Sequence, residues 1–213
     1  MTGEFVARME DVLELYAQPH DEKRPVVCVD ELSKELHGQV AEPIPPRPGQ
    51  PAKEDYEYRR HGTANLFLLL CPLLGWRHLE VTARRGYHEF AHLMKALVDV
   101  HFAKAEVVRV VLDNLNTHVP GALYETFPAA EARRIATRLE FHYTPKHGSW
   151  LNMAELEFSV LSRQGLNRRI ASAEELVAEV AAWEQQRNQA KAKIEWTFRV
   201  VDARKKLHWI YPS

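Results

Sequence analysis

Cysteine is scarce in this chain, with only Cys28 and Cys71 among 213 residues. Each lies inside an apolar run typical of a strand, which indicates buried free thiols in a reducing compartment and argues against a disulfide framework. The sequence also lacks a signal peptide, and its longest apolar run, residues 66–76, is too short to span a bilayer and is broken by Pro72. These absences predict a cytoplasmic protein that does not enter the membrane.

Neither sign of charge predominates, because 28 Lys and Arg oppose 29 Asp and Glu. With 46% hydrophobic and 27% charged residues, the composition is that of an ordinary globular protein that can bury one sizeable core. The charge is unevenly spread, since residues 1–57 contain 13 acids and 6 bases whereas residues 159–213 contain 6 acids and 10 bases. A basic C-terminal end can follow a phosphate backbone, although a solvated basic surface explains the pattern equally well.

Hydrophobic periodicity predicts an α/β protein in which a mixed central sheet is flanked by helices. The expected strands are 26–30, 63–71, 77–83, 106–112 and 138–143, and the second and third form an antiparallel hairpin. The expected helices are 3–16, 87–102, 121–136 with an interruption at Pro128, 150–163, and 172–189. Little regular structure is expected from 33 to 61, where the proline-rich segment 43–51 predicts an extended surface loop. Residues 190–213 form a basic, aromatic tail.

Residues 141–165 set a carboxylate in a mostly apolar helix behind a turn that contains proline and glycine. Ser149 is a good N-cap for the helix 150–163. Within it, Glu155 shares a helical face with Leu151 and Phe158, so we expect its side chain to point toward the packed side. A charge placed there is either paired or bound to a metal ion.

Two further carboxylates each close an apolar strand, Asp30 after 25–29 and Asp113 after 107–112. Either alone is commonly a turn former, but parallel neighbouring strands would bring the two together, and a helix crossing the sheet could add Glu155. Three carboxylates can hold the two metal ions of phosphoryl transfer, and hard oxygen ligands favour Mg²⁺ or Mn²⁺ over zinc. Glu157 is the rival to Glu155, but a separation of two residues on a helix is about 200° of rotation, so only one can face the site. We favour Glu155.

At these residues the chain resembles the mariner-type DDE transposases of bacterial insertion sequences, whose catalytic domain has the ribonuclease H-like fold. The resemblance extends over nearly the whole chain and rests on CVDE at 28–31, LDNLNTH at 112–118 and YTPKHGSWLNMAELE at 143–157. Leu151, Asn152 and Glu155 match the pattern LN-x-x-E, which carries the family's last catalytic acid.

The resemblance implies that Asp30, Asp113 and Glu155 are catalytic and bind two Mg²⁺ or Mn²⁺ ions. Water would first cut the end of the element, and the freed 3′-hydroxyl would then attack target DNA. The implied partners are double-stranded DNA and further copies of the chain, in a homodimer or a larger synaptic complex.

Residues 1–213 would form a single catalytic domain. Full-length members of the family also carry an N-terminal helix-turn-helix, and about thirty residues before Asp30 do not accommodate one, so we expect it to be absent. Two alternatives stay open: a related nuclease that cuts without joining, and an inactive remnant that binds DNA or inhibits an intact transposase.

Several polar residues are candidate contacts with substrate. Asn114 and His118 follow the second acid closely enough to reach a phosphate, although Asn114 could equally cap a turn and His118 could simply precede a helix. Asn152 lies within the motif of the last acid. The remaining candidates are basic residues of the C-terminal part of the chain: Arg163, Arg168, Arg169, Arg204, Lys205 and Lys206.

Overall fold

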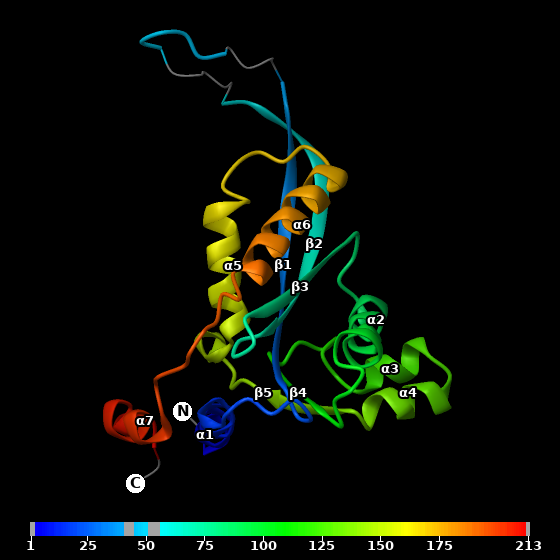
Figure 1. Cartoon of the computed structure of the whole chain (residues 1–213), viewed down its shortest axis with the longest axis vertical. Coiled ribbons are helices and arrows are strands. Elements are labelled where there is room, and N and C mark those ends of the chain that lie inside the picture. Colours follow the sequence, from blue (N-terminus) through cyan, green and yellow to red (C-terminus); the bar gives the residue numbers. More distant parts are fainter. Residues whose placement is uncertain (1–2, 41–44, 51–55, 212–213) are drawn as a thin grey trace.

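The computed structural model describes residues 3–40, 45–50 and 56–211. In these residues five strands form one mixed sheet in the order β3-β2-β1-β4-β5 (Figure 1). The strands are β1 (Val26–Gln39), β2 (Tyr58–Cys71), β3 (Trp76–Thr82), β4 (Val108–Leu112) and β5 (Leu139–Tyr143). β1, β2 and β3 pair antiparallel, whereas β4 runs parallel to both β1 and β5. The expected combination of an antiparallel hairpin and parallel strands is therefore confirmed.

Helices cover both faces of this sheet. They are α1 (Gly3–Ala17), α2 (Tyr87–Ala96), α3 (Gly121–Thr126), α4 (Ala129–Ala136), α5 (Met153–Gln164), α6 (Ala173–Gln189) and α7 (Val200–Lys206). The helices α2, α3 and α4 pack on one face, and α5 and α6 lie on the other (Figure 1). None of the helices in the described ranges is both long and apolar enough to cross a membrane.

The core divides into two layers because successive strand side chains point to opposite faces of the sheet. Cys28 of β1 and Val111 of β4 belong to the layer beneath α1, α5 and α6. Val27 and Val29 belong to the layer beneath α2, α3 and α4. All five residues of β4 are buried, as is typical of a parallel strand covered on both sides.

The turn between β2 and β3 requires a glycine. Gly75 has a φ of +65°, and a Cβ added there would lie 2.4 Å from the backbone carbon of Lys191. Only glycine combines this left-handed conformation with such a close approach of the C-terminal segment.

The expectation of little regular structure from 33 to 61 is wrong. β1 continues to Gln39 and pairs with β2 as far as Tyr58, with an irregularity between Glu35 and His37. The outer part of this ribbon has polar side chains and residues 58–63 are exposed, so its sequence lacks the hydrophobic pattern of a half-buried strand. Residues 43, 44 and 51 of the proline-rich segment lie outside the described residues, whereas 45–50 are exposed at the far end of the ribbon (Figure 1).

The helix that contains Glu155 begins later than expected. Ser149–Leu151 form a 3₁₀ turn, and α5 begins at Met153 with Asn152, not Ser149, as its N-cap. Elsewhere the agreement is closer: α3 and α4 separate at Pro128, and Ser172 caps α6 by accepting a hydrogen bond from the Glu175 N–H at 3.2 Å. The predicted helix 87–102 is α2 followed by a π-helical turn, Leu97–His101.

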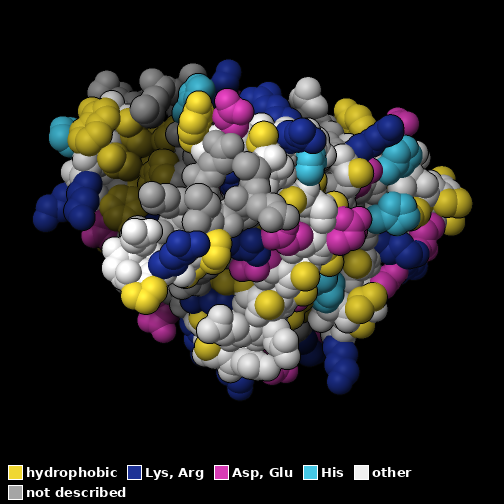
Figure 2. Space-filling model, turned by 90° about the horizontal axis from the view of Figure 1, so that it is seen from above, with side chains coloured by type: hydrophobic (Ala, Val, Ile, Leu, Met, Phe, Trp, Pro, Cys, Tyr) yellow, Lys and Arg dark blue, Asp and Glu magenta, His cyan; other side chains and the backbone are white. Residues whose placement is uncertain are grey.

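Charged side chains are mixed over the surface. On the face shown in Figure 2, Lys and Arg are dispersed among Asp and Glu and do not gather in one patch. On this face the uneven distribution of charge along the sequence does not appear as a basic patch.

Candidate active site

Asp30 and Asp113 come together at the centre of the sheet. β1 and β4 pair in parallel with Cys28 opposite Val111, so two residues further along each strand Asp30 lies beside Asp113. Because side chains alternate, Asp30 shares the face of Cys28, which is the face covered by α5. The two acids are thus neighbours, as the parallel-strand argument expects.

Asn152 fixes the start of α5 to β1. Its Oδ1 accepts a hydrogen bond from the Ala154 N–H at 3.1 Å, which caps the helix, and its Nδ2 donates to the carbonyl oxygen of Val29 at 2.8 Å. Val29 immediately precedes Asp30, so this single side chain brings the first turn of α5, with Glu155, toward Asp30. The amide is 2% exposed and both of its ends are engaged. The structure therefore gives Asn152 an internal positioning role in place of the expected contact with substrate.

Glu155 and Glu157 have opposite environments. Glu157 is fully buried and pairs with Arg77 at 2.9 Å and with Arg187 at 2.9 Å. Glu155 is partly exposed, and its carboxylate forms no hydrogen bond or ion pair with any described residue. Glu155 lies at the edge of the packed side of α5. It is partly exposed but close enough to Asp30 to raise the pKa of that carboxyl, whereas Glu157, Phe158 and Leu161 are buried. The carboxylate without a partner is that of Glu155.

Negative charge accumulates around Asp30. Burial is the largest cause that raises the pKa of Asp30, and together with the neighbouring carboxylates of Glu31, Glu155 and Asp113 it brings the value to about 7, against one favourable hydrogen bond. That bond is donated by the Glu31 N–H to Oδ1 at 2.9 Å. A divalent cation would relieve this repulsion, and carboxylate oxygens are the ligands that Mg²⁺ and Mn²⁺ prefer. The side chains present therefore fit such an ion.

The acidic side chains do not converge into a complete metal site in the described part of the chain. Among the described residues, no three His, Cys, Asp or Glu side chains have an arrangement that could hold a metal ion. One reason is visible at Asp113, whose Oδ1 contacts the Nδ1 of His118 at 2.6 Å and accepts a bond from the Leu115 N–H at 3.2 Å.

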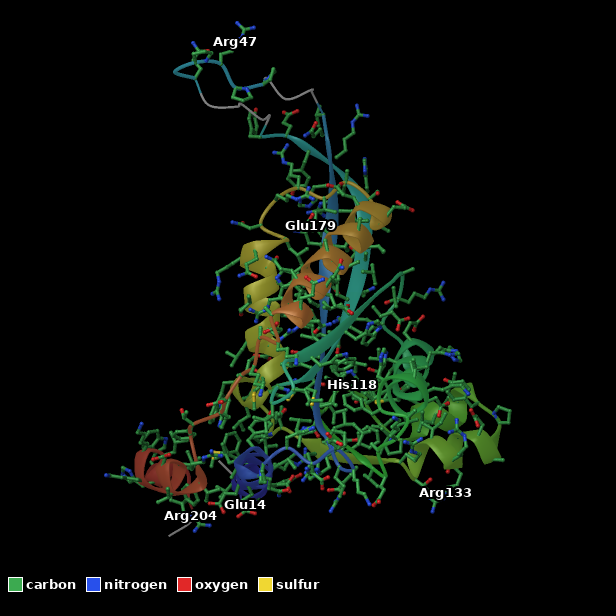
Figure 3. The ribbon with its side chains drawn as sticks, in the orientation of Figure 1. Glu14, Arg47, His118, Arg133, Glu179 and Arg204 are labelled. Carbon is green, nitrogen blue, oxygen red and sulfur yellow. The ribbon has the colours of Figure 1, made fainter. Side chains whose placement is uncertain are left out.

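His118 lies inside the protein between two carboxylates. It is 1% exposed, and its Nε2 lies 3.0 Å from the Oε2 of Glu31 on the side opposite its contact with Asp113. Burial by itself lowers the pKa of His118, but the contacts with Asp113 and Glu31 outweigh it and raise the value to about 9. Burial likewise raises the pKa of Asp113, but the His118 contact outweighs it and lowers the value. Figure 3 shows His118 between β1 and α2, so its ring is not placed to contact a phosphate.

Asn114 remains at the surface beside these acids. Its Nδ2 donates to the Thr144 carbonyl oxygen at 2.6 Å, and its Oδ1 accepts a hydrogen bond from Arg8. It borders an open cleft whose other walls are Phe5, Arg8 and the loop 145–147. Of the two polar residues expected to follow Asp113 toward a substrate, only Asn114 is exposed.

The basic candidates differ in how far their charge is already compensated. Arg168 pairs with Glu175 at 2.6 Å and Glu179 at 2.9 Å, and Arg204 pairs with Glu10 at 2.7 Å. Arg169 donates to the carbonyl oxygen of Glu57 at 3.1 Å, and Lys206 lies 5.8 Å from the ring centre of Phe198. Arg163, Lys205 and Lys206 are the members of this group that are exposed without an ion pair to a described residue, and of these Lys206 lies over an aromatic ring. The folded chain therefore offers fewer unpaired cations than the sequence suggests.

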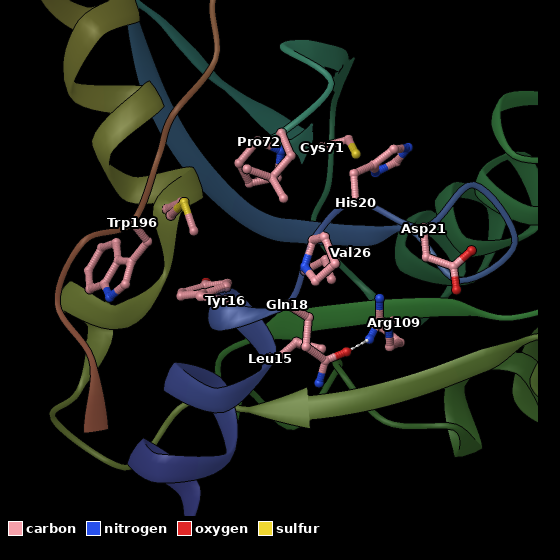
Figure 4. A pocket seen from close by; sticks show the side chains of 13 residues that line it. Leu15, Tyr16, Gln18, His20, Asp21, Val26, Cys71, Pro72, Arg109 and Trp196 are labelled. Atoms are coloured by element: carbon pink, nitrogen blue, oxygen red, sulfur yellow. Dashed lines mark hydrogen bonds between the residues drawn. The ribbon is translucent and has the colours of Figure 1, made fainter. Parts of the chain in front are cut away.

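A small apolar cavity lies away from these acids, and none of the predicted site residues lines it. Figure 4 shows it where α1, the start of β1 and the C-terminal segment meet, with Leu15, Tyr16, Val26, Pro72 and Trp196 around it. Tyr16 donates to the Leu151 carbonyl oxygen at 2.8 Å. We attribute this cavity to imperfect packing at a junction of three segments.

Glu31 was missed by the sequence analysis. It is the second acid of CVDE, and strand alternation alone places it on the face opposite Asp30, where an apolar residue would be expected. The available signal in the sequence was therefore an acid at a strand position where the alternating pattern calls for an apolar residue. Its partner His118 is 87 residues away, and no local pattern connects the two.

The order of the strands and the helices on both faces of the sheet are those of a ribonuclease H-like fold. Residues 25–177 match the family described as DDE superfamily endonuclease, and the chain belongs to that family. No curated protein matches the chain.

Solved structures of Mos1 mariner transposase share the fold. A paired-end complex with Mn aligns with a TM-score of 0.60 at 14% identity and covers 90% of this chain and 58% of that one. A paired-end complex with the left transposon end gives 0.59 at 14% identity, with 90% and 59% covered. The strand transfer complex gives 0.58 at 14% identity, with 87% and 55% covered. The chain thus spans less than two thirds of these proteins' length, and the likeness concerns the fold.

Proposed function

We propose that this chain is the catalytic domain of a DNA transposase, which cuts phosphodiester bonds at the ends of a mobile element and joins the freed ends to target DNA. The observation that carries the proposal is the uncompensated negative charge of Asp30 and Glu155 beside Asp113, within the segment that matches the DDE family. In an ordinary core such charges would be paired, as Glu157 is.

In this proposal Asp30, Asp113 and Glu155 hold two Mg²⁺ or Mn²⁺ ions. When bound, such ions stabilise the attacking and leaving oxygens of an in-line displacement at phosphorus. The hydrogen bonds of Asn152 keep the start of α5 against β1, which holds Glu155 near Asp30. The partners would be double-stranded DNA and further copies of the chain in a homodimer or larger synaptic complex, with Asn114, Arg163 and Lys205 available to phosphates.

The test incubates the purified chain with supercoiled plasmid and a labelled linear duplex, with Mg²⁺ or Mn²⁺. We expect nicked and linear plasmid together with joined products, and none of these from Asp113→Ala. Cleavage without joining would instead support a nuclease. A folded protein that binds DNA and yields no cleavage with either metal would support the inactive remnant and contradict the proposal.

A further inference from the structure

Glu31 is a buried carboxylate on the face of the sheet away from the proposed metal ligands. Asp30 and Glu31 are consecutive on β1, so their side chains leave the strand in opposite directions. Glu31 pairs in register with Phe67 of β2, which belongs to the layer under α2, and its side chain is 4% exposed. Glu31 therefore cannot share a ligand position with Asp30.

His118 connects Glu31 to Asp113 across the end of the sheet. Its two ring nitrogens lie 3.0 Å from Glu31 Oε2 and 2.6 Å from Asp113 Oδ1. The ring also lies against Phe90, with 4.9 Å between the centroids, and the backbone of His118 is held by the Tyr143 hydroxyl, which donates to its carbonyl oxygen at 2.8 Å. A side chain fixed at so many points fixes the carboxylate that it contacts.

The His118 contact engages one carboxylate oxygen of Asp113 and leaves the other oxygen available. Oδ1 takes both the His118 contact and the Leu115 N–H bond, whereas Oδ2 has no hydrogen-bond partner among the described residues. One rotamer is thus selected, with a single oxygen free for another ligand. Buried ion pairs usually add little net stability compared with apolar side chains of similar size, so stability alone does not explain this arrangement.

We propose that Glu31 and His118 are positioning residues that orient Asp113 for a divalent cation, with Glu31 acting through His118. This inference rests on the proposed function, since it assumes that Asp113 binds metal. Ligating carboxylates and their hydrogen-bonding neighbours work together in metal sites, and loss of such a neighbour typically costs about 10- to 100-fold in metal affinity or activity.

The test measures Mn²⁺ binding by isothermal titration calorimetry in the full chain, alongside Mn²⁺-dependent DNA cleavage. Variants are His118→Asn, Glu31→Gln, the double variant and Asp113→Ala. We expect His118→Asn to weaken Mn²⁺ binding by about 10- to 100-fold and to raise the Mn²⁺ concentration for half-maximal cleavage in parallel, with cleavage recovered at high Mn²⁺. Glu31→Gln should act in the same direction more weakly, and the double variant should resemble His118→Asn because coupled residues are not additive.

Glu157→Gln is the matched control, since it alters another buried ion-paired carboxylate that contacts neither His118 nor Asp113. All variants are compared below their melting temperatures, and Glu157→Gln should bind Mn²⁺ like the unaltered chain. If the unaltered chain binds Mn²⁺ and His118→Asn binds it equally well, the positioning role is wrong. An additive double variant would show that Glu31 does not act through His118. Failure of the unaltered chain to bind Mn²⁺, in contrast, would refute the proposed function.

Discussion

At the scale of single residues, two acids on α5 show how the neighbours of a carboxylate determine whether its charge is already compensated. Glu157 is surrounded by Arg77 and Arg187, which neutralise it in the core. Glu155, two positions earlier, has a neighbouring acid in Asp30 and no cation within ion-pair distance in the described residues. The first arrangement neutralises a charge within the packing of α5, and the second is the one that we propose to bind a metal ion.

We predict that Glu155→Gln lowers DNA cleavage by about 100-fold or more, because a lost metal ligand removes several kcal/mol of transition-state stabilisation. Glu157→Gln should retain most cleavage below its melting temperature while losing about 3 kcal/mol of stability, since it leaves two arginines without their buried partner. Cleavage assays and thermal melts on both variants distinguish the roles. The reverse pattern would show that the wrong face of α5 has been assigned to the site.

A pH prediction follows from Asp30, whose pKa is raised to about 7 from an ordinary 3.8. Between these two pKa values Asp30 retains a proton in the folded chain that it has lost in the unfolded chain. The stability due to this proton is fully present below the pKa of the unfolded chain and is lost as pH rises through the pKa of the folded chain. Without metal, Asp30→Asn should therefore melt progressively above the unaltered chain from pH 5 to 8. Melting curves at both pH values check this, and a constant difference between them would contradict the raised pKa.

At the scale of elements, the sequence predicted what depends on local signals. Pro128 separates α3 from α4 and Ser172 begins α6, both from nearby residues. The start of α5 was misplaced because Ser149 and Asn152 are both good caps. The choice is made by a hydrogen bond from Asn152 to Val29, 123 residues earlier, which no local pattern contains.

The acids of the candidate site likewise divide into those with a local signal in the sequence and those without one. Asp30 and Asp113 were found because each closes an apolar run. The exposure of Glu155 and the Glu31–His118 contact could not be found, since both depend on which segments the fold places side by side. The outer β1–β2 ribbon was missed because most of its side chains are polar, and Leu36 is the buried apolar residue among them.

We predict that Asn152→Ala costs about 1 kcal/mol through loss of the N-cap and also lowers cleavage, because α5 loses its link to β1 next to Asp30. Ser172→Ala provides a matched comparison, since it removes an N-cap on α6 away from the acids. It should lower stability by a similar amount and leave cleavage nearly unchanged. Equal loss of activity in the two variants, measured well below their melting temperatures, would remove the positioning role of Asn152.

At the scale of the whole molecule, folding compensates much of the C-terminal positive charge. Arg168 and Arg204 are each held by carboxylates, and Glu10, on the acidic N-terminal helix, is the partner of Arg204. On the proposed function, contacts between the described surface and DNA would depend mainly on phosphates reached by unpaired cations, and such contacts position DNA without reading its sequence.

We therefore predict non-specific DNA binding with a dissociation constant on the order of micromolar or weaker at physiological salt. Replacing Arg163 and Lys205 together with Ala should weaken binding to all sequences about equally and reduce the salt slope by about 2. Replacing the paired Arg168 and Arg204 should have a smaller effect. Fluorescence anisotropy on a terminal-repeat duplex and a scrambled duplex at two salt concentrations tests this. A preference of about 100-fold for one duplex would exceed what phosphate contacts provide and would mean that the chain reads bases.

The most direct measurement of the central claim is anomalous diffraction from crystals of this chain soaked in Mn²⁺. We expect anomalous peaks within about 2.5 Å of the carboxylate oxygens of Asp30, Asp113 and Glu155, accompanied by a modest movement of these side chains toward the ion. Crystals of Asp113→Ala should lose or weaken those peaks. Mn²⁺ bound only at other acids, or no Mn²⁺ between these three in crystals that leave the site open to solvent, would contradict the assignment of the active site.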